Sequence, residues 1–273
     1  MSGLIEIFHY QFFLNALMAA LMAGVSCGIV GTYIVARRKV FISGGITHAS
    51  FGGIGMAYYF GIAPLLGAAL FAIFSAFGIE FFNKRGQIRE DASIAIWWSL
   101  GMALGIIFVY LTPGYVPNLM SYLFGSILTV STSEIWMMFA LNLVLIAFFL
   151  IFFRTILYIS FDEDFAKTTG IRVSLFNYLM IALIALTIVL NIRVVGIILI
   201  LSLLTIPQAT ANLFTKSFKK LIFLSAGFAF LGAFSGLLIS YLADIPSGAA
   251  IIFTLVIVFG LAKLVKVIVV SKK

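Results

Sequence analysis

The stretch from residue 135 to residue 153 reads IWMMFALNLVLIAFFLIFF and contains no charged side chain. As an α-helix its 19 residues would extend about 28 Å, because each residue adds about 1.5 Å. That length matches the hydrocarbon core of a lipid bilayer, which is about 30 Å thick. The stretch therefore predicts a membrane-crossing helix, and it indicates the class of fold for the rest of the chain.

Similar apolar stretches recur along the whole chain. Of its 273 residues, 63% are hydrophobic and 10% are charged, and the mean hydropathy is +1.22. A soluble domain has roughly 45–50% apolar and about 25% charged residues, and a soluble fold of this size could not bury so much apolar surface. This composition excludes a disordered chain, a disulfide-rich secreted domain and a soluble enzyme.

We predict an all-α, polytopic transmembrane bundle that forms a single domain over residues 1–273, with about eight or nine spans. The predicted spans are Phe12–Ala36, Val40–Phe60, Pro64–Phe82, Ala92–Leu111, Ile135–Phe153, Ser174–Leu190, Val194–Asn212, Leu221–Ala243 and Ala249–Val267. A further stretch, Leu119–Val130, is too short to span. It follows Pro113 and Pro117, so we expect a short re-entrant or interfacial helix there.

Pairs of glycines four residues apart predict close contacts between helices. Packing within the chain is the favoured interpretation, and a dimer interface is the alternative. The pairs are Gly24 with Gly28, Gly101 with Gly105, and Gly232 with Gly236.

The basic residues indicate how the chain lies in the membrane. If the N-terminus is outside and each predicted span reverses the side, 16 of the 17 Lys and Arg residues face the cytoplasm, and only Arg193 lies outside. Cytoplasmic loops carry an excess of basic residues, so we predict an external N-terminus and a cytoplasmic C-terminus. This topology accounts for the net charge of +8 without a nucleic-acid partner.

Polar side chains inside spans are informative, because each is costly unless it is paired or hydrated. His48, in the segment Ser43–Ser50, is the only histidine within the predicted spans. A neutral imidazole is a good ligand for zinc, manganese or iron. The alternative is a packed histidine that hydrogen-bonds a neighbouring carbonyl.

Asp244 begins a second polar segment, in which Pro246 and Gly248 interrupt the helix. Such a break can direct a carboxylate into a cavity, although Asp244 could instead be an exposed helix cap. Helical rise places Asp244 far outward of His48. The two share one site only if the break lies below the membrane surface, and otherwise they are two stations on one path.

A third segment, Gly196–Ala211, carries Ser202, Thr205 and Gln208 at three-residue spacing, which predicts one polar helix face. Pro207 lacks an N–H and should free a carbonyl near Leu203. A polar stripe beside a kink suits the wall of a transport pathway. Alternatively, the hydroxyls bond to their own helix.

The largest predicted inner loop contains a fourth segment. It begins with Asp162, Glu163 and Asp164, which predict one or two helical turns that end at Gly170. The neighbouring apolar residues, Phe161, Phe165 and Ala166, favour docking on a cytoplasmic partner. A solvated interfacial helix is the alternative. No Gly-x-x-x-x-Gly-Lys-Ser/Thr loop is present, so ATP would have to be used by another subunit.

In this order, the segments resemble the membrane permeases of ABC-type zinc and manganese importers, from Phe12 to the last predicted span. The segments that carry the resemblance are Arg37-Arg38 with Ser43–Ala49, Tyr122–Val130, Val195–Ala211 and Asp244–Gly248. The chain departs from the family pattern at two positions. Gly44 stands where the family has aspartate, and Gln208 stands where it has alanine.

The resemblance implies an ATP-driven importer of divalent metal ions in a prokaryotic plasma membrane, without a permanently bound cofactor. It implies a homodimer that binds two cytoplasmic ATP-binding subunits and receives metal from an extracytoplasmic metal-binding protein. The coupling helix would lie in the segment from Asp162 to Gly170.

The resemblance also implies that His48 and Asp244 line the metal path, and we expect Thr47, Ser202 and Thr205 to line it as well. The amide oxygen of Gln208 could replace the missing carboxylate. Manganese favours oxygen ligands, so the loss at position 44 favours zinc.

Two other functions are compatible with the sequence. A permease for a metal chelate such as a siderophore would need a wider pathway. An intramembrane enzyme that uses His48 would need a second catalytic group at the same depth, and Thr47 or Ser50 is a poor candidate because the sequence offers no pair of a base and a residue that orients it. We therefore predict a transport subunit with no enzymatic activity of its own.

Overall fold

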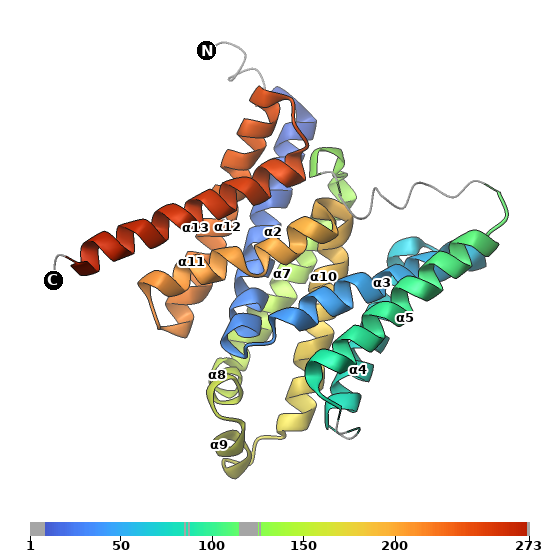
Figure 1. The fold of residues 1–273 in the computed structure, drawn as a ribbon, viewed down its shortest axis with the longest axis horizontal. Coiled ribbons are helices and arrows are strands. Elements are labelled where there is room, and N and C mark those ends of the chain that lie inside the picture. The colour runs from blue at the N-terminus through green and yellow to red at the C-terminus, as the bar shows by residue number, and fades with distance from the viewer. Residues whose placement is uncertain (1–8, 85, 87, 115–124, 126, 272–273) are drawn as a thin grey trace.

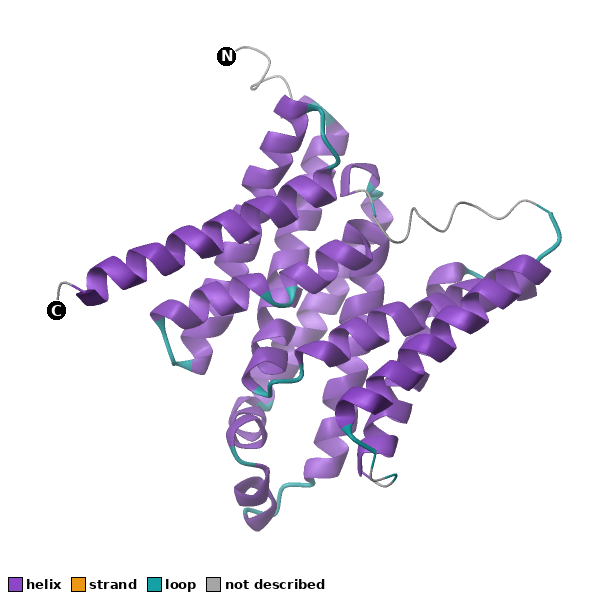
Figure 2. Ribbon diagram, in the orientation of Figure 1, coloured by secondary structure: helices purple, strands orange, loops and turns teal. Residues whose placement is uncertain are grey.

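The computed structural model describes residues 9–84, 86, 88–114, 125 and 127–271, and this part of the chain is helical with no strand (Figures 1 and 2). The helices, labelled as in Figure 1, are α2 (Gln11–Ala36), α3 (Val40–Phe60), α4 (Pro64–Lys84), α5 (Glu90–Leu111), η2 (Ile127–Thr129), α7 (Thr132–Ile151), α8 (Phe153–Phe161), α9 (Glu163–Thr168), α10 (Val173–Leu203), α11 (Ile206–Phe214), α12 (Phe218–Ala243) and α13 (Ser247–Ser271). The all-α prediction is confirmed. The predicted helix at Leu119–Val130 lies partly outside the described residues, and its described part contains only the short η2.

Within the described residues, seven helical stretches are long and apolar enough to cross a membrane. They are Gln11–Ala36, Pro64–Lys84, Glu90–Leu111, Thr132–Ile151, Val173–Phe214, Phe218–Ala243 and Ser247–Ile268. The chain is therefore a multi-pass membrane protein, but the predicted number of eight or nine spans is not confirmed. The α3 helix is less apolar because it is rich in glycine, serine and threonine, and α10 with α11 forms one stretch of 42 residues.

The α10 helix is broken at Gly196, where the backbone adopts φ 80° and ψ 165°. Glycine tolerates this positive φ because it has no Cβ. The loop predicted between the spans Ser174–Leu190 and Val194–Asn212 is instead helical, and the break lies a few residues after it. Figure 1 shows α11 running in a different direction from the first part of α10. Gly125 packs closely against this break, because a Cβ added at Gly125 would lie 2.3 Å from the Gly196 nitrogen.

The helices share one large hydrophobic core, to which α2 and α10 contribute the most buried residues, and a small second cluster joins α8, α9 and α10. The α3 helix packs mainly on α5 and α4, and α2 packs mainly on α12 and α7. The predicted glycine faces lie within these contacts. An added Cβ would come within 2.9 Å of backbone atoms of Ala226 at Gly28, of Ala49 at Gly101, and of Ile251 at Gly236. Packing within the chain, the favoured interpretation of these pairs, is therefore confirmed.

The two ends of the bundle carry different segments. Figure 1 places the start of α2 and the α12–α13 turn at one end, and α8 and α9 at the opposite end. Asp244 is therefore separated along the bundle from the segment that begins at Asp162, as the predicted topology requires.

Candidate functional site

His48 lies on α3 with its imidazole stacked on the indole of Trp98 from α5. The ring centroids are 4.1 Å apart, and the ring planes differ by 6°. Neither imidazole nitrogen forms a hydrogen bond to another described residue, and Nδ1 is buried. The bond to a neighbouring carbonyl that the packed-histidine alternative required is therefore absent from the described residues. The stack holds the ring in place while leaving its nitrogens free of protein partners.

Gly44 lies one helical turn before His48 and faces the same indole. A Cβ added at Gly44 would lie 3.7 Å from Leu201 Cδ2 and 3.9 Å from Trp98 Cζ3, which are ordinary contact distances. The position therefore has room for a side chain but supplies none. No group of three or more His, Cys, Asp or Glu residues that could hold a metal ion occurs in the described part of the chain. Thr47 is buried, and its Oγ1 donates to the Ser43 carbonyl at 2.5 Å.

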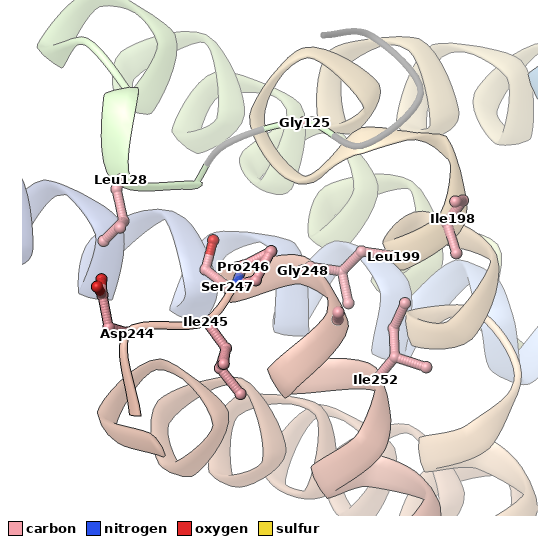
Figure 3. Close-up of a pocket in the computed structure, with 11 residues that line it drawn as sticks. Gly125, Leu128, Ile198, Leu199, Asp244, Ile245, Pro246, Ser247, Gly248 and Ile252 are labelled. Carbon is pink, nitrogen blue, oxygen red and sulfur yellow. The ribbon is translucent and has the colours of Figure 1, made fainter. Parts of the chain in front are cut away.

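Asp244 ends α12 and lies at the rim of a pocket of about 490 Å³ (Figure 3). It adopts the left-handed conformation, with φ 52°, and its N–H donates to the Ser240 carbonyl. The pocket is lined by Gly125, Leu128, Ile198, Leu199, Asp244, Ile245, Pro246, Ser247, Gly248, Ala249 and Ile252.

The position of Asp244 combines both interpretations of the sequence. It caps α12, and its carboxylate forms no hydrogen bond or ion pair with any other described residue. His48 does not line this pocket. In this structure the two predicted metal ligands thus lie at separate positions.

Gln208 lies beside the interruption between α10 and α11 and hydrogen-bonds across it. Its Nε2 donates to the carbonyls of Cys27, at 2.7 Å, and Leu203, at 3.1 Å. The Leu203 carbonyl is the one that Pro207 leaves without its helical donor, as the sequence predicted. Gln208 is buried, and its Oε1 has no partner among the described residues. The amide therefore ties α11 to α2, and a role for its oxygen as a metal ligand stays a prediction.

The predicted polar stripe is not one continuous helix face. Ser202 belongs to α10, whereas Thr205 caps α11, so the break separates their helices. Ser202 Oγ donates to the Ile198 carbonyl at 3.2 Å, and Thr205 Oγ1 donates to the Leu201 carbonyl at 2.8 Å. The expectation of a shared face with Gln208 is wrong, because helical spacing does not continue across the break.

At the opposite end of the molecule, Glu163 ties α9 to two other helices. Its Oε1 lies 2.7 Å from Arg37 Nη2 at the end of α2, and it accepts from Asn177 Nδ2 of α10 at 2.7 Å. Arg37 also donates to the Ile159 carbonyl at 2.6 Å. Burial raises the pKa of Glu163, but the hydrogen bond from Asn177 and the charge of Arg37 outweigh burial and lower the pKa below its usual value. Glu163 is therefore ionised at neutral pH.

The α9 helix has the boundaries that the sequence predicted. Asp162 Oδ1 accepts from the backbone nitrogens of Asp164 and Phe165 and so caps its first turn, and Gly170, with φ 81°, follows its end. Ala166 is buried, whereas 49% of Phe165 is exposed. Figure 1 shows α9 at the tip of the molecule. An apolar side chain held out on a capped helix suits contact with a partner.

Two features of these sites gave no sequence signal. The ion pair of Arg37 with Glu163 joins residues 126 positions apart, which helical periodicity cannot relate. Trp98 is one of several aromatic residues in an apolar span, and only the packing of α5 on α3 brings it to His48.

Comparison with known proteins identifies the family. Residues 9–266 match the family described as the ABC 3 transport family. The chain belongs to the ABC 3 transport family. The manganese transport system membrane protein MntC of Halalkalibacterium halodurans is 31% identical over 94% of this chain and 88% of its own length. The manganese import system permease protein ScaB of Streptococcus gordonii is 32% identical over 92% of this chain and 90% of its own length.

Solved structures support the same family. A chain of the structure described as PsaBC from Streptococcus pneumoniae in complex with Fab has a TM-score of 0.84 and 31% identity, with 95% of each chain covered. The predicted resemblance is therefore confirmed: this ABC 3 chain is a membrane permease of metal-ion importers. One of these relatives is named a membrane protein of a manganese transport system, and the other a permease protein of a manganese import system.

Proposed function

We propose that this chain is the permease subunit of an ATP-driven importer that carries manganese across the plasma membrane. The observation that carries the proposal is His48, which is stacked on Trp98 with no hydrogen-bond partner among the described residues. An imidazole with a free ring nitrogen can bind a divalent metal ion. The names of the MntC and ScaB relatives support manganese as the ion.

Zinc is the second candidate, and Gly44 is the observation that favours it. The chain supplies no carboxylate one turn before His48, and manganese favours oxygen ligands more strongly than zinc does. The sequence alone favoured zinc because of this position. The names of several manganese-transporting relatives are stronger support, so we propose manganese as the transported ion.

In the proposed pathway, a metal ion from an extracytoplasmic binding protein enters at the pocket beside Asp244, whose carboxylate is free to attract a cation. It then meets His48 in a transient site, with Thr47, Ser202 and Thr205 nearby on the pathway. A site with few ligands binds the metal ion weakly, so the ion can be released to the cytoplasm, as transport requires. The proposed topology has the N-terminus outside, so that α9 reaches the cytoplasm.

The proposed transporter contains two copies of this chain and two ATP-binding subunits. The segment from Asp162 to Gly170 would transmit the motion of these subunits to the permease. Three features support this role: the exposed Phe165, the capped helix, and the anchoring of Glu163 to α2 and α10. The ATP-binding subunits would supply the hydrolysis, for which this chain has no phosphate-binding loop.

The test is metal uptake by proteoliposomes that contain the permease with its ATP-binding subunits and its metal-binding protein. We expect ATP-dependent uptake of radioactive manganese, with zinc as the stronger competitor among other divalent ions. Uptake of a metal chelate with no uptake of free ions would overturn the proposal in favour of a chelate importer. Equal uptake without ATP would remove the coupling from the proposal.

A further inference from the structure

Another pocket, of about 270 Å³, lies between α2, α8, α11 and α12, and neither His48 nor Asp244 lines it. It is lined by Thr32, Val35, Ala36, Arg38, Phe161, Gln208, Asn212, Lys216 and Leu221. Its wall combines apolar side chains with two cations and no acid. Such a lining suits a ligand that has both an anionic and an apolar part.

Arg38 differs from its two basic neighbours in the chain because both neighbours pair with acidic side chains. Arg37 pairs with Glu163 at 2.7 Å, and Lys39 lies 3.7 Å from Glu80 and 3.6 Å from Glu90. Arg38 has no hydrogen-bond or ion-pair partner through its side chain in the described part of the chain. Arg38 lies at the α2–α3 turn with a left-handed backbone, φ 57°, and it also lines a neighbouring pocket that contains Lys39, Glu90 and Asp91, although it pairs with neither acid. One cation of three thus stays available for an external anion.

Lys216 supplies the second available cation from the turn between α11 and α12. Its Nζ lies 3.4 Å from Asn212 Oδ1, and it pairs with no acid among the described residues. Two cations on one pocket repel a divalent metal ion, which argues against a metal-binding role for Gln208, the one predicted metal ligand that also lines this pocket. They attract a phosphate, which accepts charge-assisted hydrogen bonds from arginine and lysine.

The location of the pocket identifies the kind of phosphate. In the proposed topology both turns lie on the cytoplasmic side, which carries 16 of the 17 basic residues, and the negative surface of a cytoplasmic leaflet attracts such clusters. Val35, Phe161 and Leu221 add apolar surface to the same pocket. Phe214 and Phe223, on the neighbouring α11 and α12, are exposed. A free anion would gain nothing from this apolar surface, whereas a phospholipid would bury the start of its acyl chains against it.

We propose that this pocket binds the phosphate headgroup of an anionic phospholipid from the cytoplasmic leaflet, with Arg38 and Lys216 as its ligands. The inference rests on the proposed topology, which places these two turns at the cytoplasmic surface. It does not depend on the identity of the transported metal. A lipid bound there would hold the end of α2 to the α11–α12 turn.

Binding is measured on the purified transporter in detergent, by native mass spectrometry during titration with phosphatidylglycerol or phosphatidylcholine. We expect one phosphatidylglycerol per permease chain to bind in preference to phosphatidylcholine. The double variant Arg38→Gln/Lys216→Gln should weaken that binding about 30-fold, since each basic residue near an anionic surface contributes about a factor of five. The matched control, Lys263→Gln/Lys266→Gln on α13, removes the same charge outside the pocket and should change binding less than about threefold.

Four results would overturn the inference. Equal losses in the two double variants would mean diffuse surface charge, and inorganic phosphate that competes as well as phosphatidylglycerol would mean a free-anion site. Unchanged lipid binding with loss of the co-purified ATP-binding subunits would mean a protein-docking surface. Unchanged lipid binding and unchanged subunits would remove any role for the two cations.

If the double variant fails to fold, Lys216→Gln alone provides the test, because Lys216 is exposed. We expect it to weaken phosphatidylglycerol binding about fivefold. Metal uptake is measured on the same preparations, so that a failure of the lipid inference is distinguishable from a failure of the proposed transport function.

Discussion

Replacing Gly44 with aspartate would restore a carboxylate one helical turn before His48. The two Cα atoms would lie about 6 Å apart along the helix axis, and residues four positions apart share a helix face. The new Cβ would meet Leu201 Cδ2 at 3.7 Å and Trp98 Cζ3 at 3.9 Å, so no neighbour has to move for it. The Cβ of the new side chain therefore fits without displacing a neighbour, and its carboxylate would be an added ligand.

The aspartate should destabilise the metal-free protein and strengthen metal binding. In the metal-free protein, a buried carboxylate without a partner should lower the free energy of unfolding by on the order of 2–3 kcal/mol. With metal bound, it should act with His48 as a second ligand. We expect at least a tenfold gain in manganese affinity, which corresponds to about 1.4 kcal/mol. The gain should be larger for manganese than for zinc, because manganese favours oxygen ligands.

The assay is a thermal-unfolding titration of the purified permease with manganese and with zinc, alongside the Gly44→Asn variant. Asparagine has nearly the shape of aspartate but no charge, so it should lower metal-free stability less and gain less affinity. Equal manganese affinity in Gly44→Asp and in the unchanged protein would refute the reasoning. That result would mean that position 44 does not face the metal bound at His48.

Three further predictions concern contacts around the two sites. Trp98→Leu should raise the KM for metal uptake about 2- to 12-fold, because it removes a stack on His48 that is worth about 0.5–1.5 kcal/mol. Trp98→Phe keeps an aromatic ring and should retain most of the stacking energy. Equal KM values in the two variants would contradict this prediction. Glu163→Gln should reduce ATP-stimulated uptake without changing metal binding. The folded pKa of Glu163 is lowered, so its contribution to stability is present above its unfolded pKa and is lost as pH falls through the folded pKa. Thermal unfolding across that window should show this loss in the unchanged protein and less of it in the variant. Gln208→Leu should leave the Leu203 carbonyl without a donor, remove a second hydrogen bond from the helical Cys27 carbonyl, and lower the free energy of unfolding by about 1–3 kcal/mol; a change under about 0.5 kcal/mol in chemical unfolding would show that water replaces the amide.

Apolar length predicted most helix positions, because a bilayer fixes how long a spanning helix must be. The predicted span Val40–Phe60 has the bounds of α3, and Phe12–Ala36 differs from α2 by one residue. The number of spans was harder to predict, since α3 is only weakly apolar and the break in α10 lies at Gly196. A glycine inside an apolar run gives no local sign of whether the helix continues through it.

The sites were predictable only where the chemistry is local. Pro207 frees the Leu203 carbonyl by its covalent structure, and Asp162 caps a helix through its own short side chain, so both followed from adjacent residues. The use of Gln208 Nε2 as the replacement donor did not, because that contact depends on how α11 packs on α2. The stack on Trp98 likewise depends on the packing of separate helices, which one sequence does not encode in its spacing.

The central claim is that His48 contacts the transported metal ion. The most direct test is ATP-dependent manganese uptake by proteoliposomes that contain the complete transporter, compared between the unchanged permease and His48→Ala. The account predicts that uptake is lost in the variant, while the ATP-binding subunits still co-purify with it and the thermal stability of the permease changes little. Uptake by His48→Ala at the unchanged rate would contradict the account.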